Sequence, residues 1–166
     1  MDTASIGNAL LGFACLSESL WIAKRAVNKW KADPHRTARN GCTLLHLACD
    51  GGSLDVVKWL VDKCKADINL PTKNGHAPLH LACIHNNLEI VKWLVNKCKV
   101  DPNLPTRNGA TPLQVARLRD NLEIVEWLTT KCKVDPNART ALQVEDAGVI
   151  KFLEEHFERK KGKFGV

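Results

Sequence analysis

The sequence predicts an all-α solenoid of four helix–turn–helix repeats with a truncated C-terminal capping repeat, and two observations carry that prediction. Residues 40–73 and 74–107 are identical at 21 of 34 positions when aligned without a gap, and a third copy opens at Asn108. Each copy also contains the i, i+3, i+4, i+7 apolar spacing of an amphipathic helix. Self-similarity at a fixed period of about 20 to 50 residues indicates units that bury their apolar faces against their neighbours.

The bulk composition is that of an ordinary globular protein with a basic balance. The chain has 166 residues, of which 45% are hydrophobic and 25% charged, and the formal net charge is +6. We predict a single domain over residues 1–158, with repeats at about 6–39, 40–73, 74–107 and 108–139 and a cap at 140–158. Residues 159–166 form a basic tail that we expect to be disordered.

Composition also argues against two other classes of protein. No apolar run approaches the roughly 18 residues of a membrane span, and the N-terminus lacks the basic region of a signal peptide, so we expect no transmembrane segment. Six of the seven cysteines fall into two periodic columns, which argues against a disulfide framework. A reducing compartment therefore fits best: the cytoplasm, with the nucleus, or a host cytosol for a delivered protein, as alternatives.

The copy at residues 74–107 shows why each unit should form two helices. Asn74-Gly75 favours a tight turn, since glycine adopts positive φ freely and asparagine tolerates it. Pro78 suits the first position of a short helix with a small-residue face. A longer helix follows at 88–95, and side chains able to cap this second helix recur at Ser19, Ser53, Asn87 and Asn121. We expect turn, short helix, longer helix and return loop in every unit.

Two segments carry a known motif. Residues 41–48 (GCTLLHLA) and 75–82 (GHAPLHLA) resemble the G-x-T-P-L-H-x-A signature of ankyrin repeats. Residues 88–95 match that family's second helix, and residues 66–69 match its A-D-x-N return. The resemblance covers nearly the whole chain. It implies antiparallel helix pairs stacked side by side, turns that project as fingers at about a right angle, and a chain that binds other macromolecules and does no chemistry.

The chain departs from the family in two ways. Its period is 34 residues rather than the usual value of about 33, because one extra residue lies near 63–65. The glycine that ends the second helix in most members is absent there, so we expect this turn to close differently. In addition, the third copy has Gln114 where the motif histidine lies.

Both ends of the array read as modified repeats. Shifting the first clear copy back by 34 residues matches it to residues 6–39, a degenerate repeat in which Arg25 replaces the tryptophan of later copies. At the other end, residues 140–158 echo the third copy with compressed spacing and read as a cap. We expect four repeats and a cap to make a complete domain.

Periodic cysteines and histidines have two interpretations. The cysteine columns, Cys15, Cys49 and Cys83 and then Cys64, Cys98 and Cys132, suit packing better than redox or metal chemistry. His46/Cys49 and His80/Cys83 are spaced as two zinc ligands on one helix face would be, but nothing completes the four ligands of a structural zinc site. In the family that the chain resembles, this histidine bonds backbone groups between fingers.

Cys42 lies outside both columns and has His46 or His76 nearby as a possible base. No third orienting residue and no oxyanion element accompanies it. We therefore predict no enzyme activity, no cofactor and no metal, and a hydrolase that depends on Cys42 is the least favoured function.

Four further columns of residues that recur every 34 positions are interpreted mainly as structural. Trp59, Trp93 and Trp127 suit packing between repeats, with a partly exposed aromatic surface as the alternative. Lysines recur near helix C-termini, where they complement the dipole, and aspartates two residues on partly cancel them. These ladders are Lys29, Lys63, Lys97 and Lys131; Lys31, Lys65, Lys99 and Lys133; and Asp33, Asp67, Asp101 and Asp135. A solvated face is favoured over a nucleic-acid site.

The finger column Arg39, Lys73, Arg107 and Arg139 has no equally regular acidic counterpart. Near-identical copies differ at Cys42/His76/Ala110, Asp50/Ile84/Leu118 and Gly51/His85/Arg119, through tuning to a partner or through drift. By family analogy these positions lie on the fingers and the concave face. The predicted partner-binding residues are Arg39, Cys42, Asp50, Lys73, His76, Ile84, His85, Arg107, Ala110, Leu118 and Arg119.

The predicted function is that of a monomeric protein-binding module, an adaptor, inhibitor or effector, whose partner is another protein with an acidic or mixed surface. The alternative is an anionic partner, a nucleic acid or an acidic membrane surface, bound through the lysine ladders and the basic tail.

Overall fold

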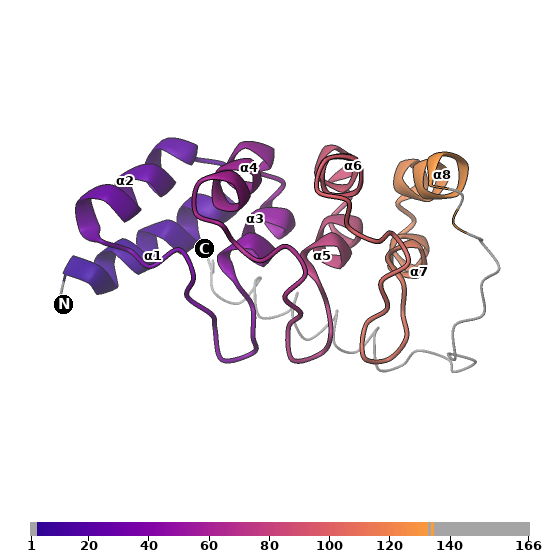
Figure 1. Ribbon diagram of the computed structural model, residues 1–166, viewed down its shortest axis with the longest axis horizontal. Helices are drawn as coiled ribbons and strands as arrows, with labels where there is room; N and C mark the ends of the chain where they lie inside the picture. Colours follow the sequence, from indigo (N-terminus) through magenta and orange to yellow (C-terminus); the bar gives the residue numbers. More distant parts are fainter. Residues whose placement is uncertain (1–2, 133, 135–166) are drawn as a thin grey trace, which may run out of the picture.

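A computed structural model describes residues 3–132 and Val134, which form a row of stacked helix pairs (Figure 1). The first helices are α1 (Thr3–Leu16), α3 (Leu44–Gly51), α5 (Pro78–Ile84) and α7 (Pro112–Leu118). The second helices are α2 (Leu20–Trp30), α4 (Leu54–Asp62), α6 (Leu88–Asn96) and α8 (Leu122–Lys131). The described residues thus contain four helix pairs, one at the place of each predicted repeat. The predicted cap at 140–158, the tail at 159–166, Arg139, Lys133 and Asp135 lie outside the described residues.

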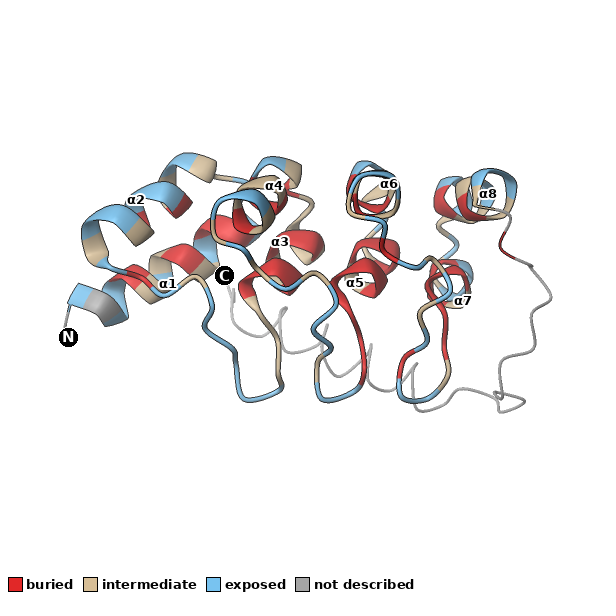
Figure 2. Ribbon diagram, in the orientation of Figure 1, coloured by how far each residue is buried: buried red, intermediate tan, exposed pale blue. Residues whose placement is uncertain are grey.

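The core runs between the two rows of helices and through the first helices (Figure 2). Small and aliphatic side chains such as Leu79, Ala82 and Cys83 are fully buried there. The cysteine column at Cys15, Cys49 and Cys83 therefore packs as small hydrophobes, and burial raises the pKa of each thiol, that of Cys15 to about 12. Such thiols stay protonated and unreactive at neutral pH.

The first repeat differs from the others at its start. Alignment places Gly7 over the turn glycines of later copies, but α1 begins at Thr3 and Gly7 lies inside it. A Cβ atom at Gly7 would lie 2.7 Å from the Cβ of Trp30, so this glycine allows α1 to approach α2 closely. The segment that aligns with a finger turn in later copies is therefore helical in the first repeat.

The expected capping of the second helices is wrong. None of the four candidate side chains makes a capping hydrogen bond: Ser19, Ser53, Asn87 and Asn121. Asn87 instead donates from Nδ2 to the carbonyls of Cys49 (2.7 Å) and Asp50 (3.3 Å) at the end of α3. Asn121 repeats this arrangement one pair further on. The amide satisfies carbonyls that a helix C-terminus leaves without partners, and so joins neighbouring repeats.

The second helices close through a lysine in the left-handed conformation, which replaces the family's glycine. Lys31, Lys65 and Lys99 have φ of 54°, 58° and 59°. The next residue then donates back across the turn, from Ala66 N to Leu60 O at 3.0 Å and equivalently in the other pairs. This closure spans seven residues, one more than the six-residue closure of a Schellman motif, and so it accommodates the extra residue of the 34-residue period.

Lys99→Gly should raise the free energy of unfolding by up to about 1 kcal/mol, because an L-residue in the left-handed region costs about 1 to 2 kcal/mol and glycine gives back part of that gain as chain entropy. Urea denaturation measures the change. Lys97→Gly is the control: Lys97 has a right-handed φ of −93°, so glycine there should only destabilise. Equal effects of the two substitutions would refute the explanation.

Candidate protein-binding surface

Fingers project from the stack between successive helix pairs (Figure 1). The same bonds close each one: in the second finger Thr72 N donates to His76 O (2.9 Å) and Gly75 N donates to Thr72 O (2.8 Å). Ala38 to Cys42 and Thr106 to Ala110 repeat this pattern. The turn glycine has φ of +84° at Gly75, a region that glycine occupies without strain.

Histidine side chains link each first helix to the next finger. His46 accepts the Thr43 N–H at Nδ1 (3.1 Å), so its proton lies on Nε2, which donates to His76 O (2.9 Å). His80 does the same with the Ala77 N–H (3.1 Å) and Ala110 O (3.3 Å). Both imidazoles are fully buried. The structural interpretation of these histidines is correct, and they hold the fingers in a fixed row.

The environment of these rings keeps them neutral. Burial lowers the pKa of His46, and burial together with the nearby His76 lowers the pKa of His80 to about 4. In the third copy Gln114 accepts the Thr111 N–H at Oε1 (2.9 Å), so it replaces the histidine's acceptor without a titrating group. The finger array therefore depends on uncharged rings at two junctions.

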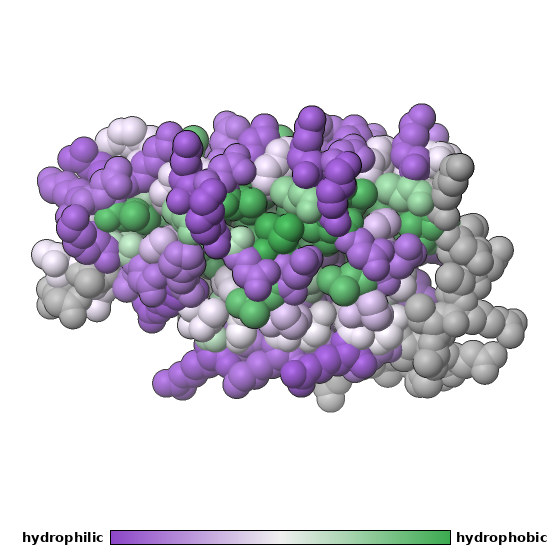
Figure 3. All heavy atoms as spheres, in the orientation of Figure 1, coloured by the Kyte–Doolittle hydropathy of each residue, from purple (hydrophilic) through white to green (hydrophobic). Residues whose placement is uncertain are grey.

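Arg39, Lys73 and Arg107 occupy equivalent places on successive fingers and are all exposed. The fingers form a continuous hydrophilic strip along the lower edge of the molecule in Figure 3. In the part of the chain that the structure describes, neither of the two ion pairs involves any of these three residues. The array thus presents a row of cations with no acidic neighbour on the fingers.

The prediction for Cys42/His76/Ala110 is corrected in part. His76 is 5% exposed and Ala110 is 1% exposed, so these side chains are not available to a partner. This column lies where a finger meets the next first helix, and the carbonyls of His76 and Ala110 receive the histidine bonds. The His76 ring packs edge-to-face on His80 with centroids 5.9 Å apart. Cys42, in the first finger, is half-buried.

The variable residues at the end of each first helix also differ in their exposure to solvent. Ile84 is 6% exposed and belongs to the core, which corrects its assignment to the binding surface. Leu118 is 46% exposed and Arg119 is half-buried. Asp50 and His85 meet across two repeats, with His85 Nε2 2.6 Å from Asp50 Oδ1. These two residues were predicted separately, and the structure brings them together as a pair.

The tryptophan and aspartate columns have structural roles. Trp59, Trp93 and Trp127 are half-buried and pack against the core, as the packing interpretation expects. The aspartates close the return loops, for example through the Asn69 N–H that Asp67 Oδ1 accepts at 2.9 Å. The described lysines of both ladders are exposed and lie close to these carboxylates in sequence: Lys29, Lys31, Lys63, Lys65, Lys97, Lys99 and Lys131.

One aromatic cluster on α2 was not anticipated. The Arg25 guanidinium lies 5.3 Å from the ring centroid of Trp21 and 5.8 Å from that of Trp30. Trp21 is 67% exposed, so the cluster is a surface feature of the first repeat. The i, i+4 spacing of Trp21 and Arg25 was a usable signal, since side chains so spaced are neighbours on a helix.

The described residues hold no group of three or more His, Cys, Asp or Glu side chains placed to bind a metal ion. Nor is any helix among them both long and apolar enough to span a bilayer.

Stacked helix pairs, projecting turns and histidine links between fingers define an all-α repeat solenoid. The family model for ankyrin repeats in three copies matches residues 11–106, and the model for a single ankyrin repeat matches residues 108–141. This chain belongs to the ankyrin-repeat family. Members of that family are typically protein–protein interaction modules without catalytic activity. No curated protein gives a significant match to the sequence.

Proposed function

We propose that this protein is a binding module whose partner presents an acidic or mixed surface to the finger row. The observation that carries the proposal is the alignment of Arg39, Lys73 and Arg107, which are all exposed and lie on finger turns whose sequences contain no acidic residue. Burying a row of like charges against an acidic partner relieves their mutual repulsion and speeds encounter.

The concave residues supply the rest of the proposed surface. Leu118 offers an exposed apolar contact, and Arg119 lies beside it. The Asp50–His85 pair gives this face a fixed polar site between two repeats. Cys42 completes the surface at the first finger. The buried residues of the predicted set, His76, Ile84 and Ala110, lie beneath this surface and do not contact the partner. The proposed module acts as an adaptor, inhibitor or effector in a reducing compartment such as the cytoplasm, as a monomer and without catalysis.

The double substitution Lys73→Glu and Arg107→Glu should weaken partner binding by at least about tenfold, since like charges placed opposite each other cost several kcal/mol. A partner is first isolated with the wild-type chain, and its affinity for each variant is then measured by titration calorimetry. Circular dichroism checks that the fold is retained.

The matched control is Lys63→Glu and Lys97→Glu, which makes the same change in net charge at the ends of α4 and α6. It should leave the affinity unchanged. Equal losses from both doubles would favour the alternative, a general attraction of nucleic acid or an acidic membrane surface to the lysine ladders, with a steep dependence on salt. Undiminished binding by the finger variant would remove the fingers from the surface.

A further inference from the structure

The junction between the first and second repeats lacks the ring that fills the later junctions. His46 and His80 insert a buried imidazole between a first helix and the following finger. The residue 34 positions before His46 is Gly12, in α1. A Cβ atom built there would meet no other atom within 4 Å, so open space lies where the later repeats hold a ring.

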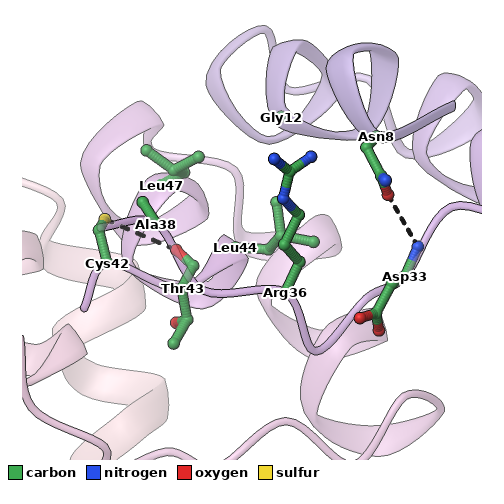
Figure 4. Close-up of a pocket in the computed structure, with 9 residues that line it drawn as sticks. All are labelled: Asn8, Gly12, Asp33, Arg36, Ala38, Cys42, Thr43, Leu44 and Leu47. Atoms are coloured by element: carbon green, nitrogen blue, oxygen red, sulfur yellow. Dashed lines mark hydrogen bonds between the residues drawn. The ribbon is translucent and has the colours of Figure 1, made fainter. Parts of the chain in front are cut away.

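That space is part of a pocket of about 180 Å³ (Figure 4). Gly12, Ala38, Leu44 and Leu47 form its apolar walls. Cys42 also lines it, and Cys42 is the counterpart of His76 and Ala110, whose carbonyls accept the imidazole Nε2–H in later repeats. The pocket therefore shares the finger side of a histidine junction, whereas the N-cap N–H that His46 and His80 accept has no counterpart there, because Ala9 lies inside α1.

A cation borders the opening of the pocket. Arg36 is exposed, and in Figure 4 its guanidinium extends from the first finger toward Gly12 on α1. The carboxylate of Asp33 points away from it in the same view and accepts the His35 N–H at 2.9 Å. A guanidinium on the rim favours a ligand that carries a carboxylate beside its ring, because planar two-point pairing is the strongest contact it makes.

We propose that this pocket receives the side chain of a histidine from an acidic segment of the partner protein. The imidazole fills the place next to Gly12 and donates to the Cys42 carbonyl, as His46 does to His76. A neighbouring carboxylate of the segment pairs with Arg36. This inference rests on the proposed function as a protein-binding module, and it adds a sequence preference at one end of the finger row.

The test uses a probe that needs no identified partner. The peptide acetyl-Glu-His-Glu-amide is titrated at pH 7.5 into the full chain labelled with ¹⁵N, and amide shifts are followed. We expect saturable shifts at Gly12, Cys42 and Leu47, with a dissociation constant on the order of 1 mM for so small a ligand. Acetyl-Glu-Ala-Glu-amide has the same charge without a ring and should bind at least about tenfold more weakly.

Variants locate the binding. Gly12→His supplies the missing ring, so it should abolish the shifts while the melting temperature stays equal or rises, because histidine is also a better helix former than glycine. Loss of binding is thus separable from loss of folding. Arg36→Gln should weaken binding about three- to tenfold, whereas Lys63→Gln, at an exposed cation outside the pocket and the finger row, should not.

Equal shifts with the alanine peptide, unchanged binding by Gly12→His, or no binding of the histidine peptide up to 10 mM would each overturn the inference. These failures are distinct from failure of the proposed function, which the Lys73→Glu, Arg107→Glu double tests on other fingers. If that double abolishes partner binding and Gly12→His does not affect it, the module stands and the pocket has no part in recognition.

Discussion

Unfolding of this chain should become easier as the pH falls from about 6.5 to about 4, with His80 alone contributing a loss on the order of 3 kcal/mol. The pKa of His80 is lowered, mainly by burial, to about 4 in the folded state, against 6.5 for an unperturbed histidine. Above pH 6.5 both states are neutral and the folded state has its full stability. Between the two pKa values only the unfolded chain takes up the proton, so the free energy of unfolding decreases as the pH decreases. Burial also lowers the pKa of His46, which adds a loss of the same sign.

The measurement is urea denaturation at pH 7.5 and at pH 4.5 on the wild type and on His46→Gln, His80→Gln. The third copy provides the model for this variant, since Gln114 already accepts the Thr111 N–H in the histidine's place. The double variant should lose most of the pH dependence in this window while it keeps the fold. If its slope equals that of the wild type, carboxylates rather than the two imidazoles control the acid sensitivity.

Gly75→Ala should destabilise the chain by about 3 kcal/mol. Part of this cost comes from φ of +84°, which an alanine adopts at about 1 to 2 kcal/mol. The remainder comes from the neighbouring finger: a Cβ at Gly75 would press on the backbone N of Arg107 and lie 2.8 Å from its Cγ and 3.1 Å from the Thr106 carbonyl carbon. Backbone atoms cannot move aside without shifting the third finger.

Gly41→Ala separates the two causes. Gly41 has nearly the same φ, +79°, but a Cβ there would lie 3.1 Å from Lys73 N, a much milder approach. We expect a loss of about 1 to 2 kcal/mol at Gly41, so the difference between the variants measures the packing of the second finger against the third. Thermal melts of both proteins give the comparison. Equal losses would show that backbone strain is the whole effect.

The repeat fold could be predicted from the sequence because residues that pack in the same way in every unit recur every 34 positions. A buried position such as Leu79 or Cys83 tolerates few alternatives, so its copies agree and the helix boundaries follow. The same logic placed the histidines between the fingers. Pro78 was a sound signal of a helix start, since it lies at the first position of α5.

The errors came from contacts that sequence spacing alone does not show. Asn87 precedes a helix as a capping residue does, but its side chain turns to carbonyls 37 and 38 residues earlier. Variation at His76 and Ala110 resembled a tuned surface, although both side chains are buried. The Asp50–His85 pair joins two copies, so no alignment of single copies reveals it.

The histidine and asparagine hydrogen bonds between repeats run in opposite directions along the chain. Together they determine how strongly neighbouring repeats resist being pulled apart. Histidine rings fasten each later junction at its finger end, and asparagine amides fasten it at the opposite end. At the first junction Gly12 and Ser53 stand at these two positions, and among the described residues neither side chain provides such a link. Among the three junctions that the structure describes, the first therefore lacks both cross-links, and under tension it should open before the other two.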